Sequence, residues 1–221
     1  MPRTKIRVLV ADDQHLVRSG ICAMIRGQRD MELAGEAENG RVAVRLAAEL
    51  APDVVLMDVT MPDLNGIDAT RDISSAGDGG PRVIALSGHS DRRFVVDVLK
   101  AGAFGYVVKD AAFDELAQAI RAVAQGKCYL SPQIAGSVVA DNRRWVPAGG
   151  SPEFEALTPR ERQVLQLMAE GKSTKAIAAA LFVGKKTVDT HRANIMAKLN
   201  ARSVAELVKY AIREGLTSVD H

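Results

Sequence analysis

Short apolar runs alternate with amphipathic stretches along the first 125 residues. The runs have the length and composition of strands at residues 6–10, 31–38, 54–57, 83–86 and 105–108. Apolar residues recur at helical spacing at residues 15–28, 40–50, 67–74, 91–101 and from 113 onward. This alternation predicts an α/β fold, a doubly wound five-stranded parallel sheet with helices on both faces.

Residues 154–221 carry helix signals throughout. Thr158–Glu161 and Ser203–Glu206 each have the form of a capping box at a helix start. Further helices are expected from Ser173 and Lys186, separated by a tight turn at Phe182–Gly184. The pattern predicts a small all-α four-helix domain that contains a helix-turn-helix.

The residues between these parts have a different composition. Residues 142–152 are polar and rich in Gly and Pro, which predicts a flexible tether, with a short helix possible over 132–140. Trp145, the only tryptophan, lies in the tether and either docks between domains or stays exposed. The expected organisation is therefore a domain at 1–125, a linker at 126–153 and a second domain at 154–221.

Composition shows an uneven charge distribution along the chain and bears on where in the cell the protein is expected. The net charge of +2 is the sum of −3 over residues 1–126, +2 over residues 127–152 and +3 over residues 153–221. An acidic front and a basic rear are a weak indication that the rear domain faces nucleic acid. Cys22 and Cys128 fit no metal or redox spacing. No apolar stretch approaches the ~18 residues of a membrane span, so we expect a cytoplasmic protein.

Polar side chains stand where four of the expected strands end. They are Asp12 and Asp13, then Asp58, Ser87 and Lys109. An Asp after a strand is usually a turn residue or a helix cap. Because the carboxyl ends of parallel strands share one edge of a sheet, however, these five are expected to converge there.

The residue types at that edge favour phosphoryl chemistry. Three carboxylates repel one another and suit Mg²⁺, which prefers hard oxygen ligands. A carboxylate such as Asp58 can act as a nucleophile and form an acyl phosphate. Ser87 can donate a hydrogen bond to phosphoryl oxygens and Lys109 can place a positive charge on them. The sequence has no Walker A or GxGxxG pattern for a bound nucleotide.

The motif resembles the receiver domain of bacterial response regulators, with its flavodoxin-like fold. The resemblance rests on Asp12-Asp13, Asp58, Met61-Pro62-Asp63 with Gly66, Ser87, and Gly105–Lys109. It implies that Asp58 is phosphorylated by the phosphohistidine of a sensor histidine kinase. It also implies Mg²⁺ held by Asp13, Asp58 and the carbonyl of Thr60, with Asp12 close by.

The resemblance further implies a switch formed by Ser87 and Tyr106, in which Ser87 moves toward the phosphoryl group and the Tyr106 ring turns inward. From the sequence alone, an equal alternative for Tyr106 is a strand-edge aromatic with its hydroxyl in water. Positions such as Thr60 and His89 tune the lifetime of the phosphoryl group in the family. For His89 the alternative is an ordinary loop histidine.

The third helix of the rear domain has a polar face that fits DNA. Its candidates are Lys185, Lys186, Thr187, Asp189, Thr190, His191, Arg192, Asn194 and Lys198. They mix phosphate-binding cations with groups that can read base edges, although an ordinary solvated face would also fit.

Leu157–Arg162, Gly171–Ser173, Lys186–His191 and Lys198-Leu199 make the rear domain similar to the LuxR/FixJ/NarL-type DNA-binding domain. This resemblance implies DNA reading by the third helix and a dimer contact on the fourth, assigned to Leu207, Lys209 and Tyr210. Two positions depart from the family: Ala176 replaces the usual Glu, and Gly184 a common Ser.

Together the resemblances imply a two-component response regulator of the NarL/FixJ type, which is not an enzyme. Phosphorylation of Asp58 would promote dimerisation and promoter binding. One alternative is a receiver that acts through protein contacts with little DNA binding. Another is a phosphatase-like enzyme with Asp58 as nucleophile, which is disfavoured because Thr60 stands where a general acid is needed.

Overall fold

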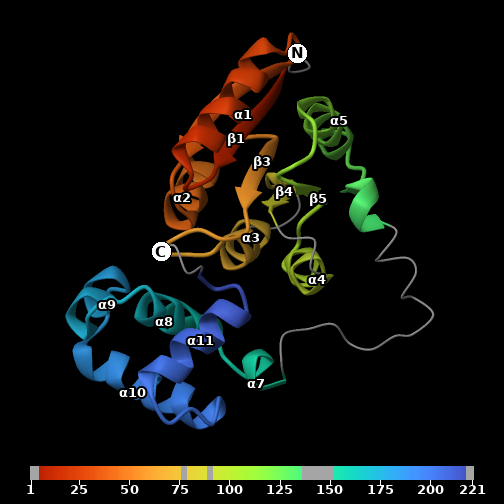
Figure 1. Ribbon diagram of the computed structural model, residues 1–221. Coiled ribbons are helices and arrows are strands. Elements are labelled where there is room, and N and C mark those ends of the chain that lie inside the picture. The colour runs from red at the N-terminus through yellow and green to blue at the C-terminus, as the bar shows by residue number, and fades with distance from the viewer. Residues whose placement is uncertain (1–4, 76–78, 89–91, 136–151, 218–221) are drawn as a thin grey trace. The chain divides into compact units, whose positions relative to one another are not determined.

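The computed structural model describes residues 5–75, 79–88, 92–135 and 152–217 (Figure 1). The chain divides into two compact units, one α/β and one helical. Outside the described ranges lie His89, the tether over residues 142–151 with Trp145, and residues 136–140 of the possible short helix.

The α/β unit is built on a parallel sheet of six strands. They are β1 (Ile6–Ala11), β2 (Met31–Ala37), β3 (Val54–Asp58), β4 (Arg82–Ser87), β5 (Gly105–Val108) and β6 (Tyr129–Leu130), in the order β2-β1-β3-β4-β5-β6. The predicted parallel α/β fold is confirmed, but the predicted count of five strands is one short. The extra strand, β6, has only two residues and pairs with β5, Gly105 opposite Tyr129.

Helices cover both faces of this sheet. They are α1 (His15–Gly27), α2 (Gly40–Leu50), α3 (Gly66–Ser74), α4 (Arg92–Lys100) and α5 (Phe113–Ala124). α1 and α5 pack together on one face, and α2, α3 and α4 follow one another on the other (Figure 1). With both faces covered, the central strands read as continuous apolar runs.

Strand β3 lies in the centre of the sheet, between β1 and β4. All five of its residues are buried, and Val54–Met57 are fully inaccessible. The neighbouring register pairs Met57 with Ala11 on β1 and Asp58 with Leu86 on β4. The apolar run thus fixes the depth of the strand and brings its last residue, Asp58, to the carboxyl edge of the sheet.

The start of the segment assigned to the linker is structured. After β6, residues 132–135 form a helical turn whose first carbonyl, that of Ser131, accepts from the amides of Ile134 and Ala135 at 2.8 and 3.0 Å. The Ile134 side chain is 1% exposed and lies in a buried cluster with residues of β5. Residues 129–135 therefore pack on the α/β unit.

The helical unit contains a one-turn helix followed by the four predicted helices. They are α7 (Pro152–Glu155), α8 (Pro159–Ala169), α9 (Thr174–Ala180), α10 (Lys185–Lys198) and α11 (Val204–Arg213). Their apolar faces meet in one core. The predicted small all-α domain is confirmed.

Helix caps in this unit follow the sequence signals with one exception. Thr158 and Glu161 make both bonds of the predicted capping box at the start of α8. At the start of α11, Ser203 Oγ accepts from the Glu206 amide at 3.2 Å, but the Glu206 carboxylate accepts from the Arg202 amide instead of that of Ser203. The second capping box is therefore only half formed.

Candidate functional site

The sheet brings the predicted polar residues to one edge. Asp12 and Asp13 follow β1, Asp58 and Ser87 end β3 and β4, and Lys109 follows β5. Carboxylate oxygens of Asp12, Asp13 and Asp58 lie within 4.8 Å of one another. Residues almost a hundred positions apart in the chain thus form one acidic site.

Lys109 is the cation of this site. Its Nζ lies 2.9 Å from Asp12 Oδ2 and 2.9 Å from Asp58 Oδ2. Burial by itself lowers the pKa of Lys109, but the two carboxylates outweigh burial and raise that pKa above its ordinary value. Lys109 is therefore held charged between the two buried carboxylates.

Asp58 lies in an environment that opposes its negative charge. It is 3% exposed, and burial raises the pKa of its carboxyl from 3.8 to about 7. The Lys109 ammonium opposes this rise, whereas the neighbouring charge of Asp12 adds to it. A single ammonium does not balance the charge of two buried carboxylates, so the site favours additional positive charge.

The loop after β3 contacts both the side chain and the backbone of Asp58. The Thr60 amide donates to Asp58 Oδ1 at 3.3 Å, and the Gly66 amide donates to the Val59 carbonyl at 2.8 Å. A Cβ at position 66 would lie only 1.9 Å from the backbone oxygen of Asp58. Glycine is required there because α3 begins in direct contact with the backbone of the site.

Other site residues were not singled out from the sequence. The Asp12 carboxylate accepts from the Gln14 amide at 2.8 Å, and Arg18 donates to the Asp12 carbonyl at 2.6 Å. Asn65 caps α3 by accepting from the Asp68 amide at 2.9 Å. Only Asn65 carries a sequence signal, that of an N-cap residue preceding a helix.

Ser87 and Tyr106 are both buried, at 2% and 0% exposure. The alternative of Tyr106 with its hydroxyl in water is therefore wrong. Its ring lies inside a cluster with Val59, Ala85 and Val108. Ser87 connects the strands through its carbonyl, which accepts from the Lys109 amide at 2.8 Å. The space beside Gly88 is open, with no atom within 4 Å of a Cβ placed there.

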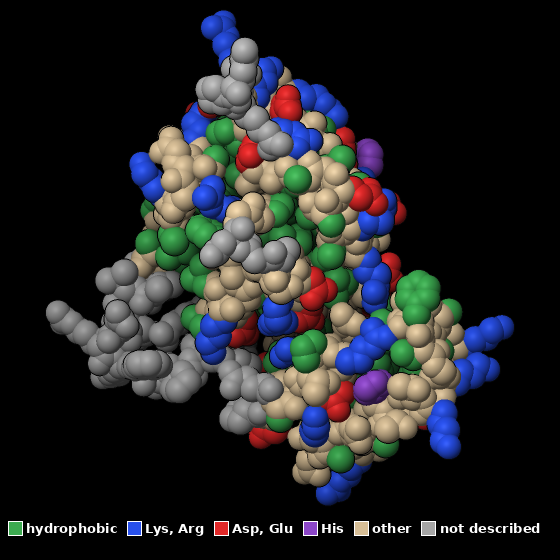
Figure 2. Space-filling model, turned by 180° about the vertical axis from the view of Figure 1, so that it is seen from behind, with side chains coloured by type: hydrophobic (Ala, Val, Ile, Leu, Met, Phe, Trp, Pro, Cys, Tyr) green, Lys and Arg blue, Asp and Glu red, His purple; other side chains and the backbone are tan. Residues whose placement is uncertain are grey.

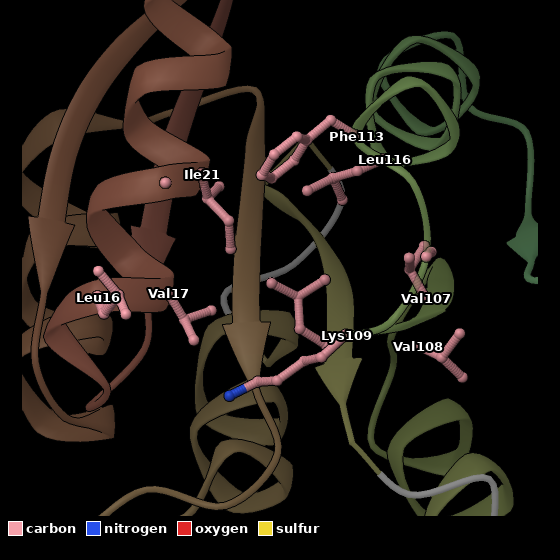
Figure 3. Close-up of a pocket in the computed structure, with 11 residues that line it drawn as sticks. Leu16, Val17, Ile21, Val107, Val108, Lys109, Phe113 and Leu116 are labelled. Atoms are coloured by element: carbon pink, nitrogen blue, oxygen red, sulfur yellow. The ribbon is translucent and has the colours of Figure 1, made fainter.

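An apolar pocket of about 230 Å³ adjoins Lys109. Figure 3 shows Val17 and Ile21 on α1 pointing toward Phe113 and Leu116 on α5, and Leu16 on α1 also lines the pocket. Leu16 and Phe113 are 85% and 58% exposed, which is unusual for large apolar side chains beside a cavity. The pocket thus offers an apolar contact surface next to the acidic site.

In the helical unit, α10 presents the predicted polar face. Val188 and Ile195 anchor the helix in the core. Of the candidates, His191 is half-buried and the others are exposed: Lys185, Lys186, Thr187, Asp189, Thr190, Arg192, Asn194 and Lys198. Lys and Arg side chains project from the visible face of this unit in Figure 2.

Lys198 differs from the other candidates because its ammonium pairs with groups of its own domain. Its Nζ donates to Glu161 Oε2 at 2.7 Å and to the Ala156 carbonyl at 3.0 Å. Burial would raise the pKa of Glu161, but Lys198 and Thr158 outweigh burial and lower it. The role of Lys198 shown by these contacts is to neutralise a buried carboxylate.

The three residues assigned to a dimer contact on α11 differ in exposure. Leu207 is 0% exposed and belongs to the core of the domain, so it is not a surface contact and that assignment is wrong. Lys209 is exposed. Tyr210 is half-buried, and its ring packs under the Arg213 guanidinium, 4.4 Å from the ring centroid.

Comparison with known proteins agrees with both domains. Residues 8–121 match the response regulator receiver domain, and residues 155–211 match the bacterial regulatory proteins of the LuxR family. The transcriptional regulatory protein LiaR of Bacillus subtilis is 40% identical over 213 residues, 96% of this chain and 100% of LiaR. The chain belongs to the LuxR-family response regulators.

Solved structures agree with this assignment. A LuxR-family response regulator from Aurantimonas sp. SI85-9A1 is 35% identical and covers 63% of this chain and 99% of its own, with a TM-score of 0.60. The response regulator ChrA of a heme-sensing two-component system is 30% identical and covers 96% of this chain and 99% of its own, with a TM-score of 0.53.

As a member of this family the chain is a DNA-binding transcription regulator controlled by phosphorylation, and not an enzyme. The receiver match lies in the N-terminal part of the chain and the LuxR-family match in the C-terminal part. Among the described residues, no helix has the length and apolar character needed to cross a membrane.

Proposed function

We propose that Asp58 is the residue that accepts the phosphoryl group. The observation that carries this proposal is its position at the sheet edge, with Asp12, Asp13 and Lys109 around it. A carboxylate oxygen of Asp58 attacks the phosphorus of a phosphohistidine on a sensor histidine kinase. The P–N bond breaks, its electron pair returns to the imidazole, and an acyl phosphate forms on Asp58.

The donor set fits Mg²⁺. Asp13, Asp58 and the Thr60 carbonyl would hold the ion, with Asp12 close by, and all of these donors are hard oxygens. Burial raises the pKa of Asp58, and the charge of Lys109 only partly offsets that rise. Mg²⁺ held by these donors would supply positive charge to the Asp58 carboxylate and to the phosphoryl oxygens.

The remaining residues of the site bind the product and report it. Lys109 is already 2.9 Å from Asp58 and can pair with a phosphoryl oxygen there. Ser87, on the adjacent strand, donates its hydroxyl to another. When the Ser87 hydroxyl is hydrogen-bonded to the phosphoryl group, the space that Ser87 leaves favours the buried position of the Tyr106 ring. Ser87 and Tyr106 are therefore the switch.

The apolar pocket beside Lys109 is suited to contact with the surface of the sensor kinase. A phosphohistidine must reach Asp58 from a protein surface that covers this edge of the sheet. Leu16 and Phe113 offer exposed apolar contacts at its rim (Figure 3). We therefore place a helix of the sensor kinase across α1 and the start of α5.

The rear domain binds double-stranded promoter DNA through α10. Lys185, Lys186 and Arg192 supply phosphate contacts, and Thr187, Asp189, Thr190, His191 and Asn194 lie on the same helix as candidates for base contacts. Lys198 is left out because its ammonium pairs with Glu161. Phosphorylation favours a homodimer, for which Lys209 and Tyr210 on α11 are the candidate contacts. Leu207 lies in the core of the domain and makes no contact with the partner.

Acetyl phosphate with Mg²⁺ tests the phosphorylation site. The wild-type chain should gain 80 Da, the mass of a phosphoryl group, and Asp58→Ala should not. An adduct that persists in Asp58→Ala would refute the assignment of Asp58.

Salt dependence of DNA binding tests α10. Each of Lys186→Ala and Arg192→Ala should weaken binding and reduce the salt slope by about 1, because each removes one phosphate contact. Lys198→Ala is the matched control and should keep the slope. If gel-shift assays with genomic fragments show no binding by the wild type, a receiver that acts through protein contacts becomes the better account.

A further inference from the structure

The segment formed by residues 129–135, here called the connector segment, lies outside both family matches, which end at residue 121 and resume at residue 155. It nevertheless packs on β5, the strand that carries Tyr106 and precedes Lys109. Along the chain it is the first part of the path that leads from the receiver to the DNA-binding domain.

Ser131 is the centre of this contact and is fully buried. Its amide donates to the Tyr106 carbonyl at 2.9 Å, and its hydroxyl accepts from the Val108 amide at 3.3 Å. The same hydroxyl donates to Glu115 on α5. Ser131 therefore holds the backbone of β5 on both sides of Val107, and Val108, one of its two backbone partners, directly precedes Lys109.

Ile134 makes the apolar half of the contact. It is 1% exposed and belongs to the same buried cluster as Tyr106 and Val108. Gly105 allows the close approach of the two strands, since a Cβ there would lie 3.1 Å from the Tyr129 carbonyl oxygen. With Tyr106 buried, therefore, the connector segment is docked.

We propose that the connector segment reads the state of the Asp58 site through β5, with Ser131 and Ile134 as positioning residues for Tyr106. This inference rests on the proposed phosphorylation of Asp58. A phosphoryl group there draws Ser87 and Lys109 toward its oxygens and favours buried Tyr106. Ser131 is hydrogen-bonded to the backbone of β5 on both sides of Val107. The movement of Lys109 and Tyr106 therefore also tightens the docking of the connector segment on β5.

Coupling of this kind is reciprocal, so loss of docking weakens the response to phosphorylation. Amide hydrogen exchange at Tyr129 and Ser131 in the full chain measures docking directly, since these amides donate to the Phe104 and Tyr106 carbonyls. Treatment with acetyl phosphate and Mg²⁺ should slow this exchange by about fivefold or more, the usual lower size of allosteric coupling. Ile134→Ala should lose that difference while it still gains 80 Da.

Two controls separate a positioning role from general loosening. Gln133→Ala, at an exposed position of the same helical turn, should behave as wild type. Ile134→Val should restore the response, because it refills most of the buried volume. The proposal is overturned if exchange at the two amides is unchanged or faster in fully phosphorylated wild type, or if Ile134→Ala keeps the full response.

A second arm does not depend on phosphorylation. In untreated protein, Tyr106→Leu should speed exchange at Tyr129 and Ser131 by about fivefold or more, with Val10 on β1 as the reference for an intact sheet. Equal exchange would overturn the coupling. Failure of the wild type to gain 80 Da would instead refute the proposed function, and this arm would still decide whether Tyr106 and the connector segment are coupled.

Discussion

Asp58→Asn should make the receiver more stable in the absence of Mg²⁺. Burial raises the pKa of Asp58 from 3.8 to about 7, so between these pH values the folded state binds more protons than the unfolded state. Stability therefore falls as pH rises through this window, and the full cost is present above pH 7. Asparagine has the same shape without the charge, and its side-chain oxygen can still accept from the Thr60 amide.

The size of the effect follows from the shift. Each pKa unit corresponds to about 1.36 kcal/mol, so the upper limit is about 4 kcal/mol. Relaxation around a charged site reduces this, and we expect about 2–4 kcal/mol of stabilisation at pH 8. For a domain of this size, 2 kcal/mol raises Tm by roughly 5–10 °C.

Calorimetry of the full chain in the presence of a chelator measures this gain in Tm. The receiver transition is identified as the one that shifts when Mg²⁺ is added. The gain in Asp58→Asn should shrink toward zero as pH falls from 8 to 4, because the wild-type carboxyl becomes neutral. Glu49→Gln, which removes one partner of an exposed pair with Arg45, is the control and should change stability by less than about 0.5 kcal/mol. An unchanged or lower Tm for Asp58→Asn at pH 8, or a gain that persists at pH 4, would refute the reasoning.

Three further predictions follow from single contacts. Gly66→Ala should destabilise the receiver by about 2–3 kcal/mol and abolish the 80 Da adduct, because its Cβ would lie 1.9 Å from the Asp58 oxygen; normal adduct yield would contradict this. Lys198→Ala should lower the Tm of the DNA-binding domain at pH 7. The loss should shrink as pH falls from 4.5 through the lowered folded-state pKa of Glu161, because the protonated carboxyl no longer contributes to stability through Lys198. Phe182→Asn should raise the stability of that domain by up to about 1 kcal/mol in denaturant titration, because Phe182 is 94% exposed at a φ of 54°, where Asn is better tolerated; a loss of stability would show that the Phe ring makes a needed contact.

Much of the receiver could be predicted because its signals are local. The apolar run of β3 and the polar residues at strand ends fix the sheet, its direction and the edge where Asp58 meets Lys109. Strand β6 could not be predicted in this way, because two residues show no periodicity and Tyr129 and Leu130 form a strand only by pairing with β5.

The open alternatives and the wrong assignments concern side chains whose state depends on distant partners. Tyr106 could lie inside or outside, and only the packing around it decides. Lys198 looks like any cation on the polar face of a helix, yet its partner Glu161 lies 37 positions earlier in the chain. Leu207 is assigned to a dimer contact by the resemblance alone, and its complete burial excludes that role.

The central claim is that phosphorylation of Asp58 controls DNA binding by α10. Its most direct test is the affinity of the full chain for a DNA site selected from a random-sequence pool, measured at fixed salt with and without acetyl phosphate and Mg²⁺. The account predicts tighter binding by phosphorylated wild type and no change for Asp58→Asn. Equal affinity of fully phosphorylated and untreated wild type would contradict it.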